Sequence, residues 1–256
     1  MFISGILLTP GCANGPPGPP YTWAPNQPFS RAAIIAISLR EWRLFGEQVN
    51  DDDHLNWDKP ERTEGLYQRV GEYWRVGMNP NLPQARWTGK HDEHGNEFPP
   101  EEDEKYAWSA AFICYVMRTA GAANAFPYAP DHAAYINAAK RSTLGIDHGW
   151  LVSAESPDAY APVPGDLICH GRDQAASLRY VDLPTTGSFP SHCDIVVESA
   201  KAGVIGVIGG NVADTVTKRH IPVTADGKLA DLEGVVLDQR RKWLVVLRVH
   251  EPAVRP

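Results

Sequence analysis

A serine, a histidine and an asparagine stand in this chain where together they could perform nucleophilic catalysis. Ser109 opens an alanine-rich run with helical composition, and a hydroxyl at a helix N-terminus gains from the helix dipole and from free backbone N–H groups. His192 begins a β-type run, and Asn211 follows two glycines at the end of the next run. A histidine on a neighbouring strand would accept the serine proton, and an amide on the following strand would orient the imidazole.

Four segments carry a resemblance to a known superfamily. They are Trp108-Ser109-Ala110-Ala111-Phe112, Pro164-Gly165-Asp166-Leu167-Ile168, Ser191-His192-Cys193-Asp194-Ile195-Val196 and Gly209-Gly210-Asn211. In this order they resemble the papain-like NlpC/P60 and CHAP cell-wall hydrolases, whose nucleophile helix, Pro-Gly-Asp-Leu turn and histidine strand follow one another in the same way. The resemblance covers roughly residues 105–215 and is strongest for a bacterial branch of unknown function with serine in the nucleophile position.

This resemblance implies a papain-like fold and the cleavage of an amide bond in peptidoglycan or a similar peptide. Ser109 would be the nucleophile, His192 the general base and Asn211 the orienting residue, with no cofactor and no metal. Backbone N–H groups at the start of the helix would form the oxyanion pocket. The predicted substrate-binding residues are Tyr106, Trp108, His132 and Asp194.

Ser109 departs from the superfamily, which carries a cysteine at this position. A serine hydroxyl is far less acidic than a thiol and relies more on a well-aligned base. Three interpretations stay open: a genuine serine nucleophile, which we favour, a relic in a domain that only binds, or an engineered replacement. Two other functions therefore remain, a non-catalytic wall-binding or interaction domain and a serine esterase or acyltransferase.

Several roles near the site also have alternatives. Asn211 after two glycines is what a tight turn would use, and some CHAP enzymes orient the histidine with a glutamate at the position of Gly209. Asp194 shares a strand face with His192 and could supply a carboxylate, or it could be a surface charge. His132 could line the cleft or simply pack beside the helix cap Asp131.

The surrounding pattern predicts an α+β domain, in which N-terminal helices pack on a small antiparallel sheet. Ser30 and Asp131 are expected to cap helices, and helical spacing predicts a core stripe of Ile35, Leu39, Trp42 and Val49 and another of Leu66, Val70, Tyr73 and Trp74. Residues 79–105 are polar and proline-rich, which favours a long surface loop. From residue 162 onward the chain alternates short β-type runs with turns, and the expected strands are 166–170, 192–198, 204–208, 215–220 and 243–250.

Composition limits the classes of function. The 256 residues carry 24 Lys+Arg against 31 Asp+Glu, a net charge of -7, so a nucleic-acid partner is not expected. Residues 1–30 hold no charged side chain but many prolines, and we expect a tail before one domain over residues 31–256. An apolar run ending in Gly11-Cys12 resembles a bacterial lipoprotein cleavage site, which favours export to the periplasm or cell envelope with a lipid anchor on Cys12. The alternative is a cytoplasmic protein with a disordered tail.

The other cysteines leave the redox compartment open. Cys169 and Cys193 both fall in expected strands and could face each other, although buried free thiols are the favoured state. Cys193 adjoins His192 and should point to the other face of its strand. Cys114 lies about 140° around the helix from Ser109 and should face away from it.

Overall fold

The computed structural model describes residues 28–52, 54 and 58–252 and has an α+β architecture. Cys12 and the predicted proline-rich segment up to residue 27 lie outside the described residues. The helices are α1 (Arg31–Leu44), α2 (Leu66–Gly77), α3 (Ser109–Thr119) and α4 (His132–Thr143). The strands are β1 (Val152–Glu155), β2 (Leu167–Gly171), β3 (Ser191–Lys201), β4 (Val204–Gly209), β5 (Thr217–Pro222) and β6 (Trp243–Val249).

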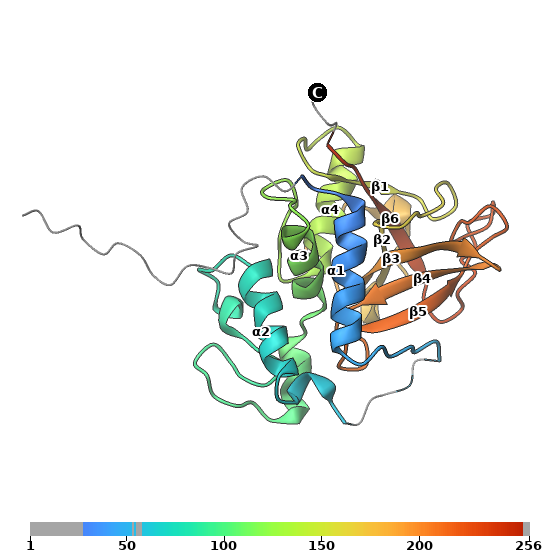
Figure 1. The fold of residues 1–256 in the computed structure, drawn as a ribbon. Coiled ribbons are helices and arrows are strands. Elements are labelled where there is room, and N and C mark those ends of the chain that lie inside the picture. Colours follow the sequence, from blue (N-terminus) through green and yellow to red (C-terminus); the bar gives the residue numbers. More distant parts are fainter. Residues whose placement is uncertain (1–27, 53, 55–57, 253–256) are drawn as a thin grey trace, which may run out of the picture.

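All six strands form one antiparallel sheet in the order β1-β6-β2-β3-β4-β5. The five expected strands are present with small shifts at their ends, and the four-residue β1 is an addition that its short length concealed. The helices gather on one side of the sheet, where α1 and α3 contact β3 and α4 contacts β1, while α2 packs on α3 (Figure 1). No helix in the described ranges is long and apolar enough to cross a membrane.

Two helices begin at the predicted caps. The Ser30 hydroxyl accepts a hydrogen bond from the N–H of Ala33 at 3.1 Å, and the Asp131 carboxylate accepts one from the N–H of Ala134 at 3.0 Å. Each side chain satisfies a backbone donor that the first helical turn leaves without a partner. Helix α3 has no such side-chain cap, so its N-terminal N–H groups face the region around Ser109.

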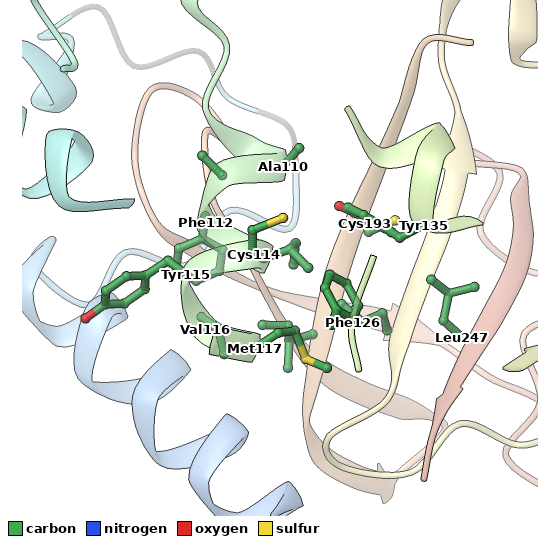
Figure 2. Close-up of a cluster of buried hydrophobic side chains, with 14 of the residues drawn as sticks. Ala110, Phe112, Cys114, Tyr115, Val116, Met117, Phe126, Tyr135, Cys193 and Leu247 are labelled. Atoms are coloured by element: carbon green, nitrogen blue, oxygen red, sulfur yellow. The ribbon is translucent and has the colours of Figure 1, made fainter. Parts of the chain in front are cut away.

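Helix α3 lies at the centre of the apolar core. Every residue from Ser109 to Met117 is buried, and Figure 2 shows Phe112, Cys114 and Met117 on different sides of this helix, with Cys193 and Leu247 on the neighbouring strands. Gly77, the last residue of α2, lies close against the backbone of α3. A Cβ at this position would lie 2.7 Å from the carbonyl oxygen of Ala111, so a glycine is needed for the two helices to pack this closely. A second apolar cluster, including Ile168, Val196 and Trp243, is built on alternate residues of the same strands.

The buried face of α1 differs from the predicted stripe. Ile34, Ser38 and Glu41 are buried, whereas the expected Ile35, Leu39 and Trp42 are only half-buried and Val49 is exposed. Glu41 is accommodated because Arg69 Nε and the Tyr73 hydroxyl donate to its Oε2 at 2.6 and 2.8 Å. Burial alone would raise the pKa of Glu41, but Arg69 and these hydrogen bonds hold it below its usual value. Apolar spacing cannot reveal a carboxylate that is buried with its own partners.

Two further expectations need correction. The segment 79–105 is not a continuous irregular loop, because it contains short 3-10 helices at Pro83–Arg86 and Pro100–Tyr106 and buries Phe98. Cys169 and Cys193 form a disulfide and are not free thiols. They stand directly opposite each other in the β2–β3 register, with Cα atoms 4.1 Å apart, and only the strand pairing could reveal this. Cys114 is a buried free thiol, and burial raises its pKa to about 12.

Candidate active site

Ser109 is the first residue of α3, and its hydroxyl meets an imidazole. Ser109 Oγ lies 2.6 Å from Nε2 of His132, which is itself the first residue of α4. The start of one helix therefore presents the hydroxyl, and the start of the other presents the ring. Ser109 is buried, with 9% of its surface exposed.

His132 is held as a neutral ring. Its Nδ1 is hydrogen-bonded to the hydroxyl of Tyr135, one helical turn later on α4. Burial, and then the nearby His192, lower the pKa of His132 well below its usual value. A neutral ring has one donor and one acceptor nitrogen, so His132 can accept the Ser109 proton in a hydrogen bond while donating to Tyr135.

His192 lies beside His132 and carries a carboxylate partner. The two ring centroids are 5.3 Å apart, and Nε2 of His192 lies 3.2 Å from Oδ1 of Asp194, two residues along β3. Asp194 is fully buried, and its second oxygen accepts from the guanidinium of Arg219 on β5. Burial would raise the pKa of Asp194, but Arg219 and His192 hold it well below its usual range, so the carboxylate is ionised.

A third histidine, His170, lies on the other side of His192. Its ring centroid is 5.7 Å from that of His192 and 5.2 Å from that of Trp243. Burial, and then the neighbouring His192, lower the pKa of His170 to about 4, so this ring is neutral near pH 7. The β2–β3 register places His170 directly opposite His192, which explains how two histidines 22 positions apart become neighbours.

Gly209 leaves room for the His192–Asp194 pair. A Cβ at this position on β4 would lie 2.0 Å from Asp194 Oδ1 and 3.0 Å from His192 Nε2. The carboxylate partner of His192 is Asp194, on the histidine strand itself. The absence of a side chain on the next strand is what makes this arrangement possible.

Asn211 does not have the predicted contact with His192. Its amide satisfies both of its neighbours when the nitrogen donates to Glu61 Oε2 and the oxygen accepts from the backbone N–H of Trp108, each at 3.2 Å. Asn211 also has a φ of 57°, in the left-handed region that asparagine adopts more readily than most residues, as its alternative prediction as a turn residue requires. Asp194, not Asn211, is the side chain hydrogen-bonded to His192, while Asn211 fixes the backbone immediately before Ser109.

Glu61 completes this clamp on Trp108. Its Oε2 also accepts a hydrogen bond from the indole Nε1 of Trp108, and Glu61 as a whole is 2% exposed. Burial, helped by the charges of Asp214 and Asp103, raises the pKa of Glu61 to about 8. Sequence reasoning missed this residue, because it lies 47 positions before Trp108 with no motif around it.

The predicted substrate-binding residues are mostly internal. Trp108 is 1% exposed and packs against Phe45 and Tyr73, so it supports α3 and does not form a pocket wall. Tyr106 stacks on Phe98 with ring centroids 3.9 Å apart. His132 and Asp194 lie in the site, but both are buried. His132 contacts Ser109, and Asp194 contacts His192. The structure thus places Ser109 against His132, and His132 beside the His192–Asp194 pair, and leaves Tyr106 outside. The hydrogen bond of the Ser109 hydroxyl is to His132 and not to the predicted base His192.

Three carboxylates near this site have the spacing of metal ligands. Glu61, Asp103 and Asp214 each offer an oxygen, and these atoms lie within 4.8 Å of one another. Lys59 already provides positive charge there, because its Nζ lies 2.5 Å from Asp103 and 3.7 Å from Asp214. We therefore assign this cluster to charge pairing around the Glu61 clamp.

Comparison with known proteins identifies a family but not an activity. A family model described as an uncharacterized protein conserved in bacteria (DUF2272) matches residues 61–249. The chain belongs to this family. The matched region contains Ser109, His132, His192 and Asp194, as well as both partners of the Glu61–Asn211 clamp. No curated protein and no solved structure matches the chain.

Proposed function

We propose that this protein is a papain-like hydrolase with a serine nucleophile that cleaves an amide bond, with peptidoglycan peptides as the substrate class. The observation that carries the proposal is one buried cluster in which the Ser109 hydroxyl, at a helix N-terminus, contacts His132, and the His132 ring lies 5.3 Å from that of His192, the partner of Asp194. The substrate class rests on the resemblance of the four motif segments to cell-wall hydrolases. The α+β fold, with α3 packed against the histidine strand β3, is compatible with that superfamily.

In this mechanism His192 is the general base. Its Nε2 faces Asp194, which leaves Nδ1 to accept the proton of Ser109 when the hydroxyl attacks a carbonyl carbon. The Asp194 carboxylate stabilises the imidazolium that forms, whereas Nδ1 of His132 is hydrogen-bonded to the neutral hydroxyl of Tyr135. His132 is therefore assigned to hold the Ser109 hydroxyl in place before attack.

The start of α3 supplies the oxyanion site. Asn211 occupies the N–H of Trp108, so the backbone N–H of Ser109 and the adjoining helix dipole are the groups available to a developing negative charge. The clamp of Glu61 and Asn211 on Trp108 fixes where that N–H points. The protonated His192 donates its proton to the leaving amine as the tetrahedral intermediate collapses to the acyl-enzyme. Water that gives its proton to His192 then attacks the ester carbonyl, and the proton returns to Ser109 as the acid is released.

An exported location is part of this proposal. The Cys169–Cys193 disulfide supports it, because disulfides persist in oxidising compartments such as the periplasm and are rare in the cytosol. The lipid anchor at Cys12 rests on the sequence alone. Globomycin treatment of expressing cells, followed by mass spectrometry of the N-terminus, tests it: an unmodified Cys12 in untreated cells contradicts the anchor.

Digestion of purified sacculi tests the function. We expect the parent protein to release muropeptides detectable by mass spectrometry, and Ser109→Ala to lower the rate by about 10³-fold or more, the scale seen when a nucleophile is removed. Equal release by the parent and Ser109→Ala contradicts the mechanism. Labelling of Ser109 by a fluorophosphonate and turnover of small esters without release from sacculi would instead identify an esterase or acyltransferase. No labelling and no release would identify a binding domain.

A further inference from the structure

Two adjoining hollows open beside His192. The first has a volume of about 330 Å³ and is lined by His192, His170 and Asn211 together with several arginines. The second, of about 490 Å³, shares His170, Arg172, Arg240 and Arg241 with the first. Because these four residues line both hollows, the two form one continuous surface, which we call the arginine pocket. His192 lines it directly, so whatever fills the pocket lies next to the proposed general base.

The arginine pocket is positively charged, although the chain as a whole has a net charge of -7. Among the described residues, the first hollow is lined by Arg172, Arg219, Arg240 and Arg241 and by no aspartate or glutamate. Within the same ranges, the second hollow adds Lys242 and one carboxylate, Asp173. In an acidic protein this local excess of cations favours an anionic occupant.

Ion pairs within the protein involve some of these cations. Arg219 is bound to Asp194, and Arg240 and Arg241 lie 3.3 and 3.9 Å from the buried carboxylate of Asp238. Arg172 is exposed, and its guanidinium forms no ion pair with any residue of the described ranges. Arg172 also lines a third hollow, with Ser191 and Asn211, so it stands at the edge of the arginine pocket. The carboxylates that line this third hollow belong to Glu101, Asp103, Glu104, Asp173 and Asp214.

We propose that the arginine pocket binds a free carboxylate of the substrate, which makes this enzyme selective for acidic peptides; this specificity rests on the proposed function. A guanidinium presents two parallel N–H donors that match the two oxygens of a carboxylate, and a bidentate contact fixes orientation as well as affinity. The neutral His170 ring adds no charge of its own and packs at the boundary of the two hollows. Arg172 is the principal contact, because the protein does not already occupy its guanidinium.

Peptide binding to the Ser109→Ala protein tests this inference without turnover. Fluorescein-labelled triglutamate and triglutamine peptides are titrated at low salt and at 150 mM salt, with affinity read by fluorescence anisotropy. We expect triglutamate to bind at least about tenfold more tightly than triglutamine, with the difference decreasing in higher salt. Arg172→Gln should remove most of that difference, while Arg75→Gln, a change of the same kind on the exposed face of α2, should preserve it.

Equal affinity for the two peptides, or an Arg172→Gln protein that discriminates as well as its parent, overturns the inference. The proposed function fails separately. Ser109-dependent release from sacculi without peptide discrimination leaves the hydrolase intact and removes the carboxylate pocket. Discrimination by Arg172 in a protein with no Ser109-dependent hydrolysis supports the pocket and removes the hydrolase.

Discussion

Gly209→Ala tests whether the His192–Asp194 pair drives the reaction of Ser109. The added Cβ would lie 2.0 Å from Asp194 Oδ1, well inside van der Waals contact. Asp194 is fully buried and bound to Arg219, so its carboxylate cannot turn out into solvent. We expect the alanine to push the carboxylate away from the His192 ring while the Arg219 contact keeps it in the protein.

The size of the effect follows from the contact that is lost. A hydrogen bond to a charged group contributes about 1.5–3 kcal/mol, which corresponds to a reaction of Ser109 that is roughly 10- to 150-fold slower. Overpacking by one methyl group costs about 1–3 kcal/mol of unfolding free energy, or about 2–12 °C in Tm for a chain of this size. The protein should therefore remain folded, with a slow nucleophile.

The assay is the second-order rate of Ser109 labelling by a fluorophosphonate, with Tm measured on the same samples. Gly206→Ala is the matched control in the same strand, because its Cβ would meet Glu198 Oε2 at 2.4 Å, and the Glu198 side chain is 49% exposed and free to move aside. A folded Gly209→Ala protein that labels at the parent rate would refute the assignment of His192 and Asp194. Equal losses in both variants would show only a general effect of crowding β4.

Three further substitutions separate the roles around the site. His192→Ala should lower the labelling rate of Ser109 by about 10³-fold. His132→Gln should keep this rate within about tenfold of the parent rate, because the glutamine amide can still bind the hydroxyl. A larger loss in His132→Gln than in His192→Ala would make His132 the base. Asp194→Asn should lower the free energy of unfolding by about 3–5 kcal/mol in urea titration, because Arg219 is then buried without a counter-charge, and an unchanged value would contradict the ion pair. The pKa of Glu61 is about 8 in the folded protein and 4.5 in the unfolded chain, so between these pH values the carboxyl is protonated when folded and ionised when unfolded. The parent protein therefore loses stability as the pH rises from about 4.5 to 8. Glu61→Gln should remove this loss, and a Tm difference from the parent that does not change between pH 5 and 8 would contradict the raised pKa.

The sequence predicted local structure well. The caps at Ser30 and Asp131, the helix that begins at Ser109 and the alternation that separates His192 from Cys193 all depend on neighbours within a few positions. The α+β class followed from the order of helical and β-type patterns. Asp194 was recognised as sharing the face of His192, but not as its partner in place of Asn211.

What remained hidden depends on contacts between distant segments. The amphipathic pattern of α1 did not show the buried Glu41, because its partner Arg69 lies 28 positions away. The Cys169–Cys193 disulfide and the His170–His192 neighbours follow from the β2–β3 register, which no single strand specifies. Glu61 accepts a hydrogen bond from Trp108, which lies 47 positions later in the sequence, and only the folded chain brings the two side chains together.

The sequence by itself therefore determined five of the six strands, the fold class and the placement of Ser109 at a helix start, because capping and periodicity act along the chain. Only the tertiary structure decided that the Ser109 hydroxyl meets His132, that Asp194 takes the place of Asn211 beside His192, and that arginines gather next to this site. These outcomes depend on how α3 and α4 dock against the sheet and on the space that Gly209 leaves open. The packing of these helices on the sheet, and the space beside Gly209, depend on contacts between segments far apart in sequence. Only the folded chain brings such segments together.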